Sequence, residues 1–481
     1  MSNTTQALSR IEAILDDSSF VEIGARVTAR ATDFNMQEKK APSDGVITGY
    51  GVVNGNLVYV HSQDASVLGG TIGEMHAKKI ASLYEKAMKM GAPVVGLIDC
   101  AGLRLQEATD ALNGFGEIYK NMSLASGIIP QITAVYGECG GGLAVLAELS
   151  DFVFVEEKKA KLFVNSPNAL DGNYESKLDT SSAKFMAEAG VVDFVGDEET
   201  IANGVRQLVS MLPSNNAEGT VCTDNQDDLN RVCQDMEAEI ADPALALTDI
   251  SDDGVFVETK AEYAKEMVTG FILVDGVTVG AVANRTALYD ENGEKAEEFA
   301  PVLTTAGAYK AAEFVTFCNA FEIPVLTLTN VKGFEATVKS ERTIAKAAAK
   351  LVYAFSNADV PKVNIITGEA YGSAYVAMNS KSIGADMVYA WPQASIGMMD
   401  ASLAAKIMYA DDIAASKDVT STINEKAAEY AALQSSVDQA AARGYVDTII
   451  NPEDTRKYVA AAFEMLFDKR EVRADKKHGT V

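Results

Sequence analysis

Histidine and tryptophan are the scarcest residues of this 481-residue chain, with three histidines and one tryptophan. His478 lies in the C-terminal tail, so a histidine-rich metal site or an HExxH motif is excluded. A Ser-His-Asp enzyme would have to use His61 or His76, and no GxSxG motif accompanies either of them. We expect both to be partly buried polar residues at the ends of secondary-structure elements. The chemistry of this protein is therefore not expected to depend on an imidazole.

Cysteine pairs, long apolar runs and positive charge are also lacking. The five cysteines include no CxxC pair, which predicts reduced thiols in a cytosolic protein and no metal in this chain. No apolar run approaches the roughly 18 residues of a membrane span, and the N-terminus lacks the layout of a signal peptide. The 68 acidic and 41 basic residues give a formal net charge of −27, which argues against a nucleic-acid or anionic-membrane surface. We therefore expect a cytoplasmic protein without a nucleic-acid partner.

What the chain does contain is an internal repeat. Five Gly or Pro anchors recur at one offset of 231 residues, namely Pro93 and Pro324, Gly102 and Gly333, Pro130 and Pro361, Gly137 and Gly368, and Gly141 and Gly372. Upstream of them, Gly55 and Gly276 are 221 residues apart, so the second half holds about ten extra residues there. Self-similarity at one fixed spacing indicates that the chain is a duplication, so the architecture can be predicted before any local motif is interpreted.

Both halves follow the same pattern of secondary structure. β-Branched runs such as VVGLID and VLTLTN alternate with Ala-, Glu- and Lys-rich amphipathic stretches such as EMHAKKIASLYEKAMKM. This alternation predicts an α/β protein with parallel β-α units packed in layers. The polar, acidic segment at about 213–250 is typical of a linker. We therefore predict a first domain over residues 1–230 and a second over residues 245–481.

Glycine-containing turns follow two predicted strands in each half. They lie at residues 99–104 and 137–143 in the first half, and at 330–334 and 368–374 in the second. Glycine lets the backbone approach a ligand closely, and free N–H groups at a helix start favour negative charge. Two such turns can supply the two converging donors of an oxyanion hole. Glycines after strands often serve helix packing alone, but the recurrence of the same pair in both halves favours function.

Several strings of residues then indicate a family. GYGVVNGNLVYVHSQDASVLGGTIGEMHAKKI, DCAGLRLQEA, SGIIPQITAVYGECGGG and ITGEAYGSAYVAM occur in this order. With them the chain resembles, over nearly its whole length, the carboxyltransferase subunits of biotin-dependent acyl-CoA carboxylases and decarboxylases. The resemblance implies tandem duplicated crotonase-like (ClpP/crotonase) domains, in agreement with the 231-residue repeat.

The same resemblance implies an activity. The family moves a carboxyl group between biotin, carried on a separate protein, and a short acyl-CoA such as propionyl-CoA or methylmalonyl-CoA. The thioester enolate and the ureido oxygen of biotin both become anionic, so two oxyanion holes are expected, with coenzyme A in the first half and biotin in the second. By similarity, the donors are N–H groups at Gly102–Leu103 and Gly141–Gly142 in the first half, and at Gly333–Phe334 and Gly372–Ser373 in the second.

Partners follow from the resemblance as well. A biotin carboxyl carrier protein and either a biotin carboxylase or a membrane decarboxylase beta subunit would have to be separate chains, the latter placing this chain at the periphery of a membrane. The family assembles as a hexamer, a trimer of dimers, with each active site between the first half of one chain and the second half of another. Neither the acyl group nor the direction of the reaction follows from the sequence.

Further candidate residues surround the expected sites. Arg104, Lys78 and Lys79 are candidates for contacts with the phosphates of coenzyme A, although solvated lysines would show the same pattern. In the AYGSAYV turn, Tyr371 is a candidate contact for the bound group, and Val376 is a candidate apolar wall for the acyl chain.

Departures from the family pattern leave two other functions open. Ala101 and Leu103 replace the usual small residues of the first turn, and Glu138 places an acid beside a site expected to hold anions. A crotonase-type hydratase or hydrolase would use Glu138 without biotin. A non-catalytic CoA-binding scaffold is the third possibility. Lys89, in a match to the biotinylation tetrapeptide, is expected to end a helix instead, and Trp391 is expected in the core.

Overall fold

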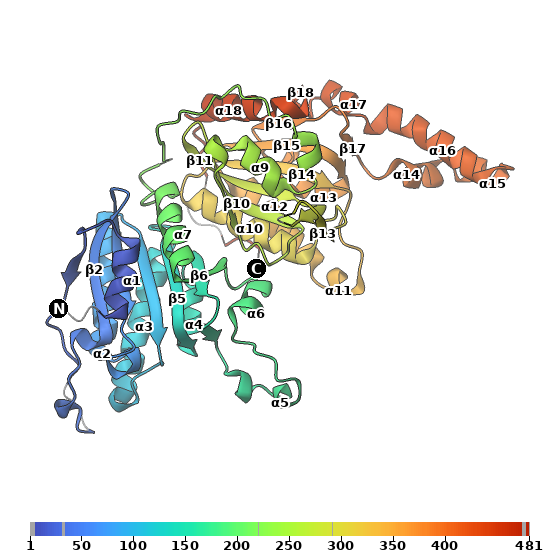
Figure 1. The fold of residues 1–481 in the computed structure, drawn as a ribbon. Helices are drawn as coiled ribbons and strands as arrows, with labels where there is room; N and C mark the ends of the chain where they lie inside the picture. Colours follow the sequence, from blue (N-terminus) through green and yellow to red (C-terminus); the bar gives the residue numbers. More distant parts are fainter. Residues whose placement is uncertain (1–4, 31–33, 220, 291, 474–477, 481) are drawn as a thin grey trace. The chain divides into compact units, whose positions relative to one another are not determined.

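The computed structural model describes residues 5–30, 34–219, 221–290, 292–473 and 478–480. The chain divides into two compact units (Figure 1). The first unit contains residues 1–221 and 260–263, and the second contains residues 222–259 and 264–481. Within the described residues no helix combines the length and the apolar character that crossing a membrane would require.

The first unit is built on an eight-stranded sheet flanked by helices. Its strands lie in the order β1 (Val21–Ile23), β2 (Val46–Val53), β3 (Asn56–Gln63), β4 (Val94–Cys100), β5 (Gln131–Gly140), β6 (Phe152–Glu156) and β8 (Phe194–Gly196), and β7 (Lys161–Phe163) pairs with β5. The pairs from β3 to β8 are parallel, whereas β1, β2 and β3 are antiparallel. Its helices are α1 (Gln6–Ile14), α2 (Glu74–Met90), α3 (Ala108–Ala125), α4 (Gly142–Glu148), α5 (Asn173–Ser176), α6 (Ala183–Glu188) and α7 (Glu198–Met211).

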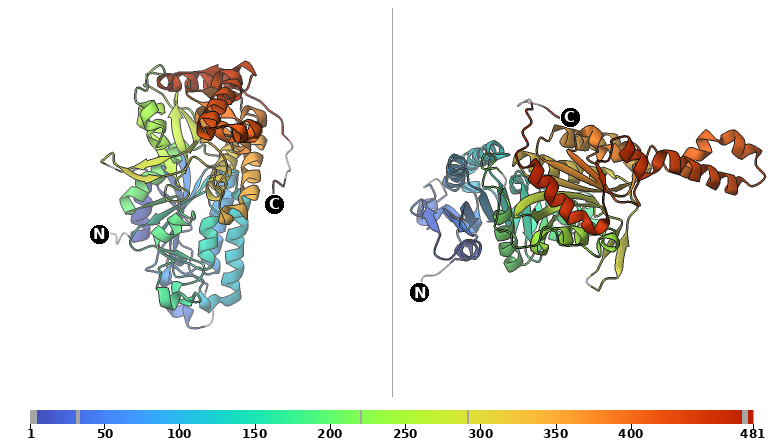
Figure 2. Two further views of the ribbon diagram at one scale, coloured as in Figure 1. Left: turned by 90° about the vertical axis from the view of Figure 1, so that its right-hand side faces the viewer. Right: turned by 90° about the horizontal axis from the view of Figure 1, so that it is seen from above.

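The second unit repeats this sheet. Its strands lie in the order β9 (Phe256–Thr259), β10 (Met267–Val274), β11 (Val277–Asn284), β14 (Val325–Val331), β15 (Lys362–Tyr371), β16 (Met387–Ala390) and β18 (Thr448–Ile449), and β17 (Ser395–Gly397) pairs with β15. Its main helices are α9 (Pro243–Ile250), α10 (Thr305–Ala320), α12 (Ile344–Asn357), α13 (Gly372–Ala377), α17 (Val437–Ala442) and α18 (Thr455–Leu466). An arm of three more helices projects from this unit (Figures 1 and 2), formed by α14 (Ala401–Met408), α15 (Ala410–Ala415) and α16 (Val419–Tyr430).

The duplication predicted from the sequence is confirmed at the level of strand register. An isolated parallel bridge joins Ile72 to Leu103 in the first unit, and another joins Leu303 to Phe334, each 231 residues later, in the second. The extra residues of the second half are the hairpin β12 (Ala287–Tyr289) and β13 (Lys295–Glu298), which is inserted between β11 and α10. The protein therefore has the tandem duplicated crotonase-like fold that the sequence predicted.

In each unit an arginine of a late helix binds the segment that follows an early helix, and we call this contact an arginine clamp. In the first, Arg206 of α7 donates to the Ile14 carbonyl (2.6 Å) and to Asp16 (2.8 Å), just after α1.

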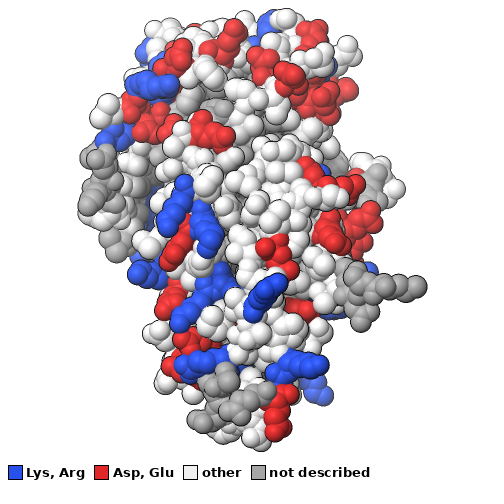
Figure 3. Space-filling view, turned by 90° about the vertical axis from the view of Figure 1, so that its left-hand side faces the viewer, with Lys and Arg blue, Asp and Glu red and all other residues white. Residues whose placement is uncertain are grey.

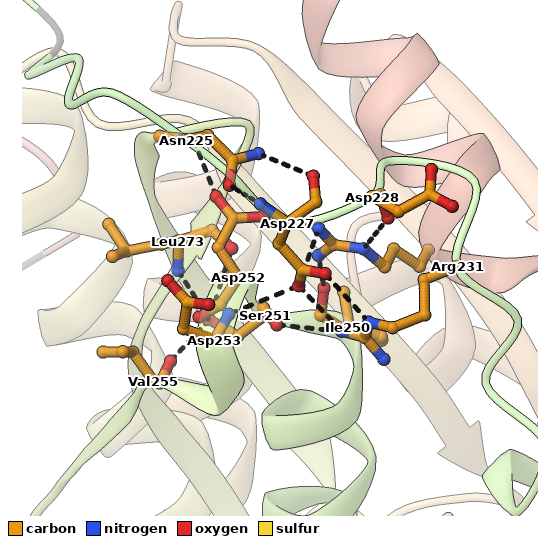
Figure 4. Close-up of polar contacts among 12 residues, drawn as sticks. Asn225, Asp227, Asp228, Arg231, Ile250, Ser251, Asp252, Asp253, Val255 and Leu273 are labelled. Carbon is orange, nitrogen blue, oxygen red and sulfur yellow. Dashed lines mark hydrogen bonds and ion pairs between the residues drawn. The ribbon is translucent and has the colours of Figure 1, made fainter.

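In the second, Arg456 of α18 donates to the carbonyl of Ile250 and pairs with Asp252 (2.7 Å), just after α9. This second clamp is extended by Asp227 and Arg231, whose contacts with Ser251 and its neighbours are drawn in Figure 4. The segment that follows residue 221 is thus fastened to the second unit by charged contacts.

The cores follow from the composition of the central strands. Val94, Val95, Leu97 and Ile98 of β4 are all buried, as expected for a parallel strand covered on both faces. In the second unit, Trp391 is fully buried and its indole N–H donates to Thr455 (3.1 Å), so the predicted core position is confirmed.

Glycine at two equivalent positions permits a close approach between neighbouring parallel strands. A Cβ atom at Gly137 of β5 would lie 2.1 Å from Oδ1 of Asp99 at the end of β4. A Cβ atom at Gly368 of β15 would lie 2.7 Å from Oδ1 of Asn330, which itself accepts the N–H of Glu369 (3.0 Å). These two glycines begin the predicted turns 137–143 and 368–374 but lie within β5 and β15, where packing between neighbouring strands requires them.

The two units differ in whether an equivalent aspartate, Asp151 in the first and Asp386 in the second, has a cationic partner. Asp151 accepts the N–H of Gln131 at the start of β5 (2.8 Å), and Asp386 accepts that of Lys362 at the start of β15 (2.8 Å). Asp386 also pairs with Lys469 (2.9 Å), whereas Asp151 has no ion pair among the described residues. Desolvation, with the negative charge of Asp193 adding to it, raises the pKa of Asp151 to about 7.

Adding a methyl group at the strand-end glycines should destabilise the protein. We expect Gly137→Ala and Gly368→Ala each to lower the free energy of unfolding by about 1–3 kcal/mol, because the new Cβ overpacks against Asp99 or Asn330. Chemical denaturation measures the effect. The matched control is Gly116→Ala in α3, where nothing lies within 4 Å of the new Cβ and a gain of up to about 1 kcal/mol is expected. Equal effects at the three sites would contradict the packing argument.

Asp151 should also impose a pH dependence. The pKa of Asp151 is higher in the folded chain than the ordinary aspartate value of 3.8, so the folded chain binds more protons between these two values. Stability therefore falls as the pH rises from about 4 to about 7. We expect the difference in melting temperature, Asp151→Asn minus the unsubstituted protein, to become more positive as the pH is raised from 5 to 8. Asp386→Asn is the control, since loss of its pairing with Lys469 should destabilise the protein at pH 8. A pH-independent effect of Asp151→Asn would contradict the assignment.

Candidate active site

The first predicted turn presents an unpaired backbone donor at Leu103. Ile72 donates its N–H to the carbonyl of Gly102 (2.9 Å) and accepts the N–H of Arg104 (2.9 Å). In a parallel bridge these bonds use the residues on either side of the bridged residue, so the N–H of Leu103 points the other way. It has no hydrogen-bond partner among the described residues. Gly102 reaches this geometry with φ = 108°, which a residue with a Cβ rarely adopts.

The second turn of the first unit offers its donor at Gly142. The N–H of Gly141 already donates to the carbonyl of Phe163 (2.8 Å), so the expected pair Gly141–Gly142 narrows to Gly142. Gly142 is the first residue of α4, where an N–H has no partner within the helix. The carbonyl of the same residue accepts the hydroxyl of Tyr119 from α3 (2.5 Å).

The second unit repeats the first of these donors closely. Leu303 donates to the carbonyl of Gly333 (2.9 Å) and accepts the N–H of Glu335 (3.0 Å), which leaves the N–H of Phe334 without a partner in the described part of the chain. Ser373 is exposed and is the second residue of α13, so its N–H also lacks a partner within the helix. The four turns predicted from the sequence therefore form two equivalent pairs, one in each unit.

A cavity opens beside the first of these pairs. It has a volume of about 370 Å³ and is lined by Leu103 and the residues around it, namely Met36, Lys39, Leu68, Thr71, Ala101, Arg104, Leu105 and Gln106. Lys39 is an exposed cation on this wall, and no motif in the sequence pointed to it. The segment before β2 reaches the cavity only through the tertiary fold.

Arg104 and Lys79, two of the three residues expected to contact phosphates of coenzyme A, are buried. Arg104 is 2% exposed and pairs with Asp44 (2.5 Å) and Glu107 (2.8 Å). Lys79 is 8% exposed and donates to the carbonyl of Ser43 (3.0 Å), while burial lowers its pKa to about 8. These contacts give Arg104 and Lys79 supporting roles within the first unit, in place of the phosphate contacts that the sequence suggested.

Lys78 is the one of the three that remains accessible. It pairs with Glu74 one helical turn earlier (2.7 Å), and this contact raises its pKa. With Lys86 it lines a groove of about 220 Å³ between α2 and residues 23–27, whose floor includes Ile23 and Leu83. The face turned toward the viewer in Figure 3 carries many Lys and Arg side chains, with Asp and Glu among them.

The remaining residues singled out in the sequence differ in their exposure. Tyr371 is buried, and its hydroxyl donates to Ser395 (2.8 Å), so its side chain supports β17. Val376 is half-buried in α13. Glu138 is exposed near the end of β5. Lys89 is exposed in the last turn of α2, where the sequence placed the end of a helix.

In the first unit, burial disfavours the charged forms of the Cys100 thiol and the His61 imidazole. Burial raises the pKa of the Cys100 thiol to about 12 and lowers the pKa of His61 to about 4. His61 and His76 are both fully buried, so the expectation of partial burial was wrong for both. The expected position at an element end was wrong for His61, which lies within β3, and right for His76, the third residue of α2. Among the described residues no group of three His, Cys, Asp or Glu side chains could hold a metal ion.

Comparisons with known proteins agree with this architecture. The carboxyl transferase domain family matches residues 2–481. The methylmalonyl-CoA decarboxylase subunit alpha of Propionigenium modestum is 39% identical, over 99% of this chain and 92% of that protein. The propionyl-CoA carboxylase beta chain of Roseobacter denitrificans is 38% identical, over 99% of this chain and 93% of that one.

A solved structure is also closely similar. The transcarboxylase 12S crystal structure, with methylmalonyl-coenzyme A and methylmalonic acid bound, superposes with a TM-score of 0.91 at 35% identity. The match covers 99% of this chain and 92% of that one. A repeated crotonase-like fold, full-length relatives above 35% identity and a matching family together lead to one conclusion: this chain belongs to the carboxyl transferase family.

Proposed function

We propose that this chain is the subunit that moves a carboxyl group between biotin, carried on a separate protein, and a short-chain acyl-CoA of the propionyl-CoA or methylmalonyl-CoA type. The observation that carries the proposal is the recurrence of an unpaired N–H at Leu103 and at Phe334, in equivalent bridges of two duplicated units. Family membership and the methylmalonyl-coenzyme A bound in the transcarboxylase 12S structure support the substrate class.

The backbone donors would act on developing negative charge. In the first unit, the N–H groups of Leu103 and Gly142 would stabilise the oxygen of a thioester enolate. In the second, those of Phe334 and Ser373 would stabilise the ureido oxygen of biotin, which supplies or accepts the carboxyl group when it is bound. Each donor costs no reorganisation when charge develops, because its orientation is fixed by the bridge or the helix start. The use of backbone donors suits a first unit whose two histidines, His61 and His76, are both buried.

The assignment of coenzyme A to the first unit rests on the cavity beside Leu103. Its volume is within the range of small-molecule sites, and its wall includes both apolar residues and the cation Lys39. Lys78 remains a candidate for a phosphate of coenzyme A. Val376 and the backbone around Tyr371 remain candidates for contacts on the second side, while the two domains, 1–230 and 245–481, are proposed to supply one oxyanion site each.

The proposed reaction requires other chains. A biotin carboxyl carrier protein must deliver the carboxyl group, and a biotin carboxylase or a membrane decarboxylase beta subunit must complete the cycle. We propose a homo-oligomer, in which a hexamer built as a trimer of dimers is supported by the hexamer assembly named for transcarboxylase 12S. Association with a membrane partner would place a cytoplasmic chain at the membrane periphery.

Carboxyl exchange tests the function directly. With methylmalonyl-CoA labelled in its free carboxyl group and with free biotin as acceptor, we expect label to move to biotin while propionyl-CoA forms. Omitting biotin is the control. Hydration or hydrolysis of an acyl-CoA without biotin, abolished by Glu138→Gln, would contradict the proposal in favour of a crotonase-type hydratase or hydrolase. Binding of coenzyme A with no reaction of any acyl-CoA would favour a scaffold.

A proline substitution should isolate one backbone donor. Gly142→Pro removes the N–H at the first position of α4, where proline is tolerated, and Gly142→Ala keeps it. Both variants add a Cβ near Phe115 and Tyr119, so they share the packing cost of that atom. We expect kcat of the proline variant to be about 10²–10³-fold below that of the alanine variant in carboxyl exchange. Equal kcat values in two folded variants would remove Gly142 from the oxyanion site.

A further inference from the structure

We propose that Asp44, Arg104 and Glu107, together with the hydroxyl of Tyr119, position the two backbone donors of the first unit. The inference rests on the proposed oxyanion function and adds to it a set of side chains that need not touch the substrate. These four side chains act through Leu103 and Gly142, so they are positioning residues.

Arg104 is the centre of this cluster. Its side chain is 1% exposed, although an isolated guanidinium is costly to remove from water. Nη1 pairs with Oδ1 of Asp44 (2.5 Å) and with Oε1 of Glu107 (2.8 Å), and Nη2 donates to the carbonyl of Thr71 (2.7 Å). One planar group therefore ties together the segment before β2, the residue before Ile72 and the turn that carries Leu103.

The two carboxylates extend these contacts to the start of α2. Glu107 accepts the N–H of Glu74 (2.6 Å), and Asp44 accepts the N–H of His76 (2.8 Å). These donors belong to the first turn of a 17-residue helix, whose N-terminus favours negative charge. The cluster holds two carboxylates and one guanidinium, so the helix start helps to balance its charge. A Cβ atom at Gly73 would lie 2.4 Å from Nη1 of Arg104, which shows that glycine makes room for the pair.

The geometry of Leu103 follows from this arrangement. Its neighbours Gly102 and Arg104 are the two residues that hydrogen-bond to Ile72. The N–H of Leu103 belongs to the Gly102–Leu103 peptide, whose carbonyl accepts the N–H of Ile72. The Arg104 side chain is held by Asp44, Glu107 and Thr71, and this restrains the next peptide, between Leu103 and Arg104. Leu103, which lines the cavity, is therefore restrained on both sides, and so is its N–H.

Gly142, the residue that carries the second donor, is held through its carbonyl from the same part of the chain. Tyr119 lies in α3, which begins directly after Glu107, and its hydroxyl donates to the carbonyl of Gly142 (2.5 Å). The ring packs edge-on against Phe115 with centroids 5.0 Å apart, which fixes its direction. A contiguous stretch, residues 104–119, thus reaches both turns that provide donors.

The described residues of the second unit include no equivalent of this charged cluster. Glu335 occupies the place of Arg104 and makes no ion pair in the described part of the chain, and Lys350 occupies the place of Tyr119. The start of α10 is capped instead by Thr304, whose hydroxyl accepts the N–H of Gly307 (2.9 Å) and donates to Glu266 (2.5 Å). Any effect of the cluster should therefore be confined to the thioester side of the reaction.

The test compares a ground-state ligand with a mimic of the enolate. Propionyl-CoA is the first probe, and the second is a nitroalkyl analogue of coenzyme A in its nitronate form, which carries negative charge on oxygen near the enolate position. The variants are Arg104→Lys, which keeps the charge but loses the planar fork, and Tyr119→Phe, which removes one hydroxyl. Tyr458→Phe in α18 is the control, since no hydrogen bond of its hydroxyl occurs among the described residues.

We expect both variants to lower kcat in carboxyl exchange about tenfold to hundredfold, with a KM for the acyl-CoA that changes less than kcat. Their affinity for the nitronate should fall by a similar factor, while that for propionyl-CoA changes little. The control should match the unsubstituted protein. Tyr119→Phe keeps the test decisive if Arg104→Lys fails to fold.

Other outcomes are informative in different ways. Folded variants that lose thermal stability but keep the preference for the nitronate would overturn the positioning role. A fall in affinity for both ligands by the same factor would overturn it as well. If the unsubstituted protein itself binds the nitronate no better than propionyl-CoA, the oxyanion function proposed for the first unit is wrong, and the inference falls with it.

Discussion

The parallel bridge between Ile72 and Leu103 is the constraint on which the first proposed site depends. A bridged residue in a parallel pairing uses the N–H and carbonyl groups of its neighbours, so its own N–H is turned away from the partner strand. The sheet thereby creates an unpaired donor without breaking any ladder bond. The same bridge at Leu303 and Phe334 produces the same donor in the second unit. A backbone group placed in this way does not depend on the identity of its own side chain, so the bulk of Leu103 leaves the donor in place.

Duplication has preserved this backbone geometry and changed what surrounds it. The arginine clamps at Arg206 and Arg456 and the strand-end pairs at Gly137 and Gly368 survive in both units. Around the donors the units diverge, with a buried charged cluster at Arg104 in the first and a threonine cap at the start of α10 in the second. Two oxyanions of different chemistry would need equal backbone donors but different supports, and the observed divergence fits that requirement.

Sequence reasoning located the turns but misjudged several side chains around them. Repetition of Gly and Pro at one spacing marks strand ends, because only those residues satisfy the turns and close approaches found there. Arg104 and Lys79 looked like phosphate contacts, since charge in a motif suggests a ligand, yet both are buried against carboxylate or carbonyl oxygens. Tyr119 and Lys39 carried no signal, because each reaches its turn or cavity from a distant part of the chain.

The sequence alone determined the α/β class, the duplication, the positions of the four turns and the membership of a family, because these depend on local pattern and on spacing along the chain. Only the tertiary structure decided which N–H groups are free, that Gly141 is already paired with Phe163, and that Arg104 faces inward to Asp44 and Glu107. A hydrogen bond between residues far apart in sequence depends on distances of a few tenths of an ångström, and no pattern of residue types encodes them.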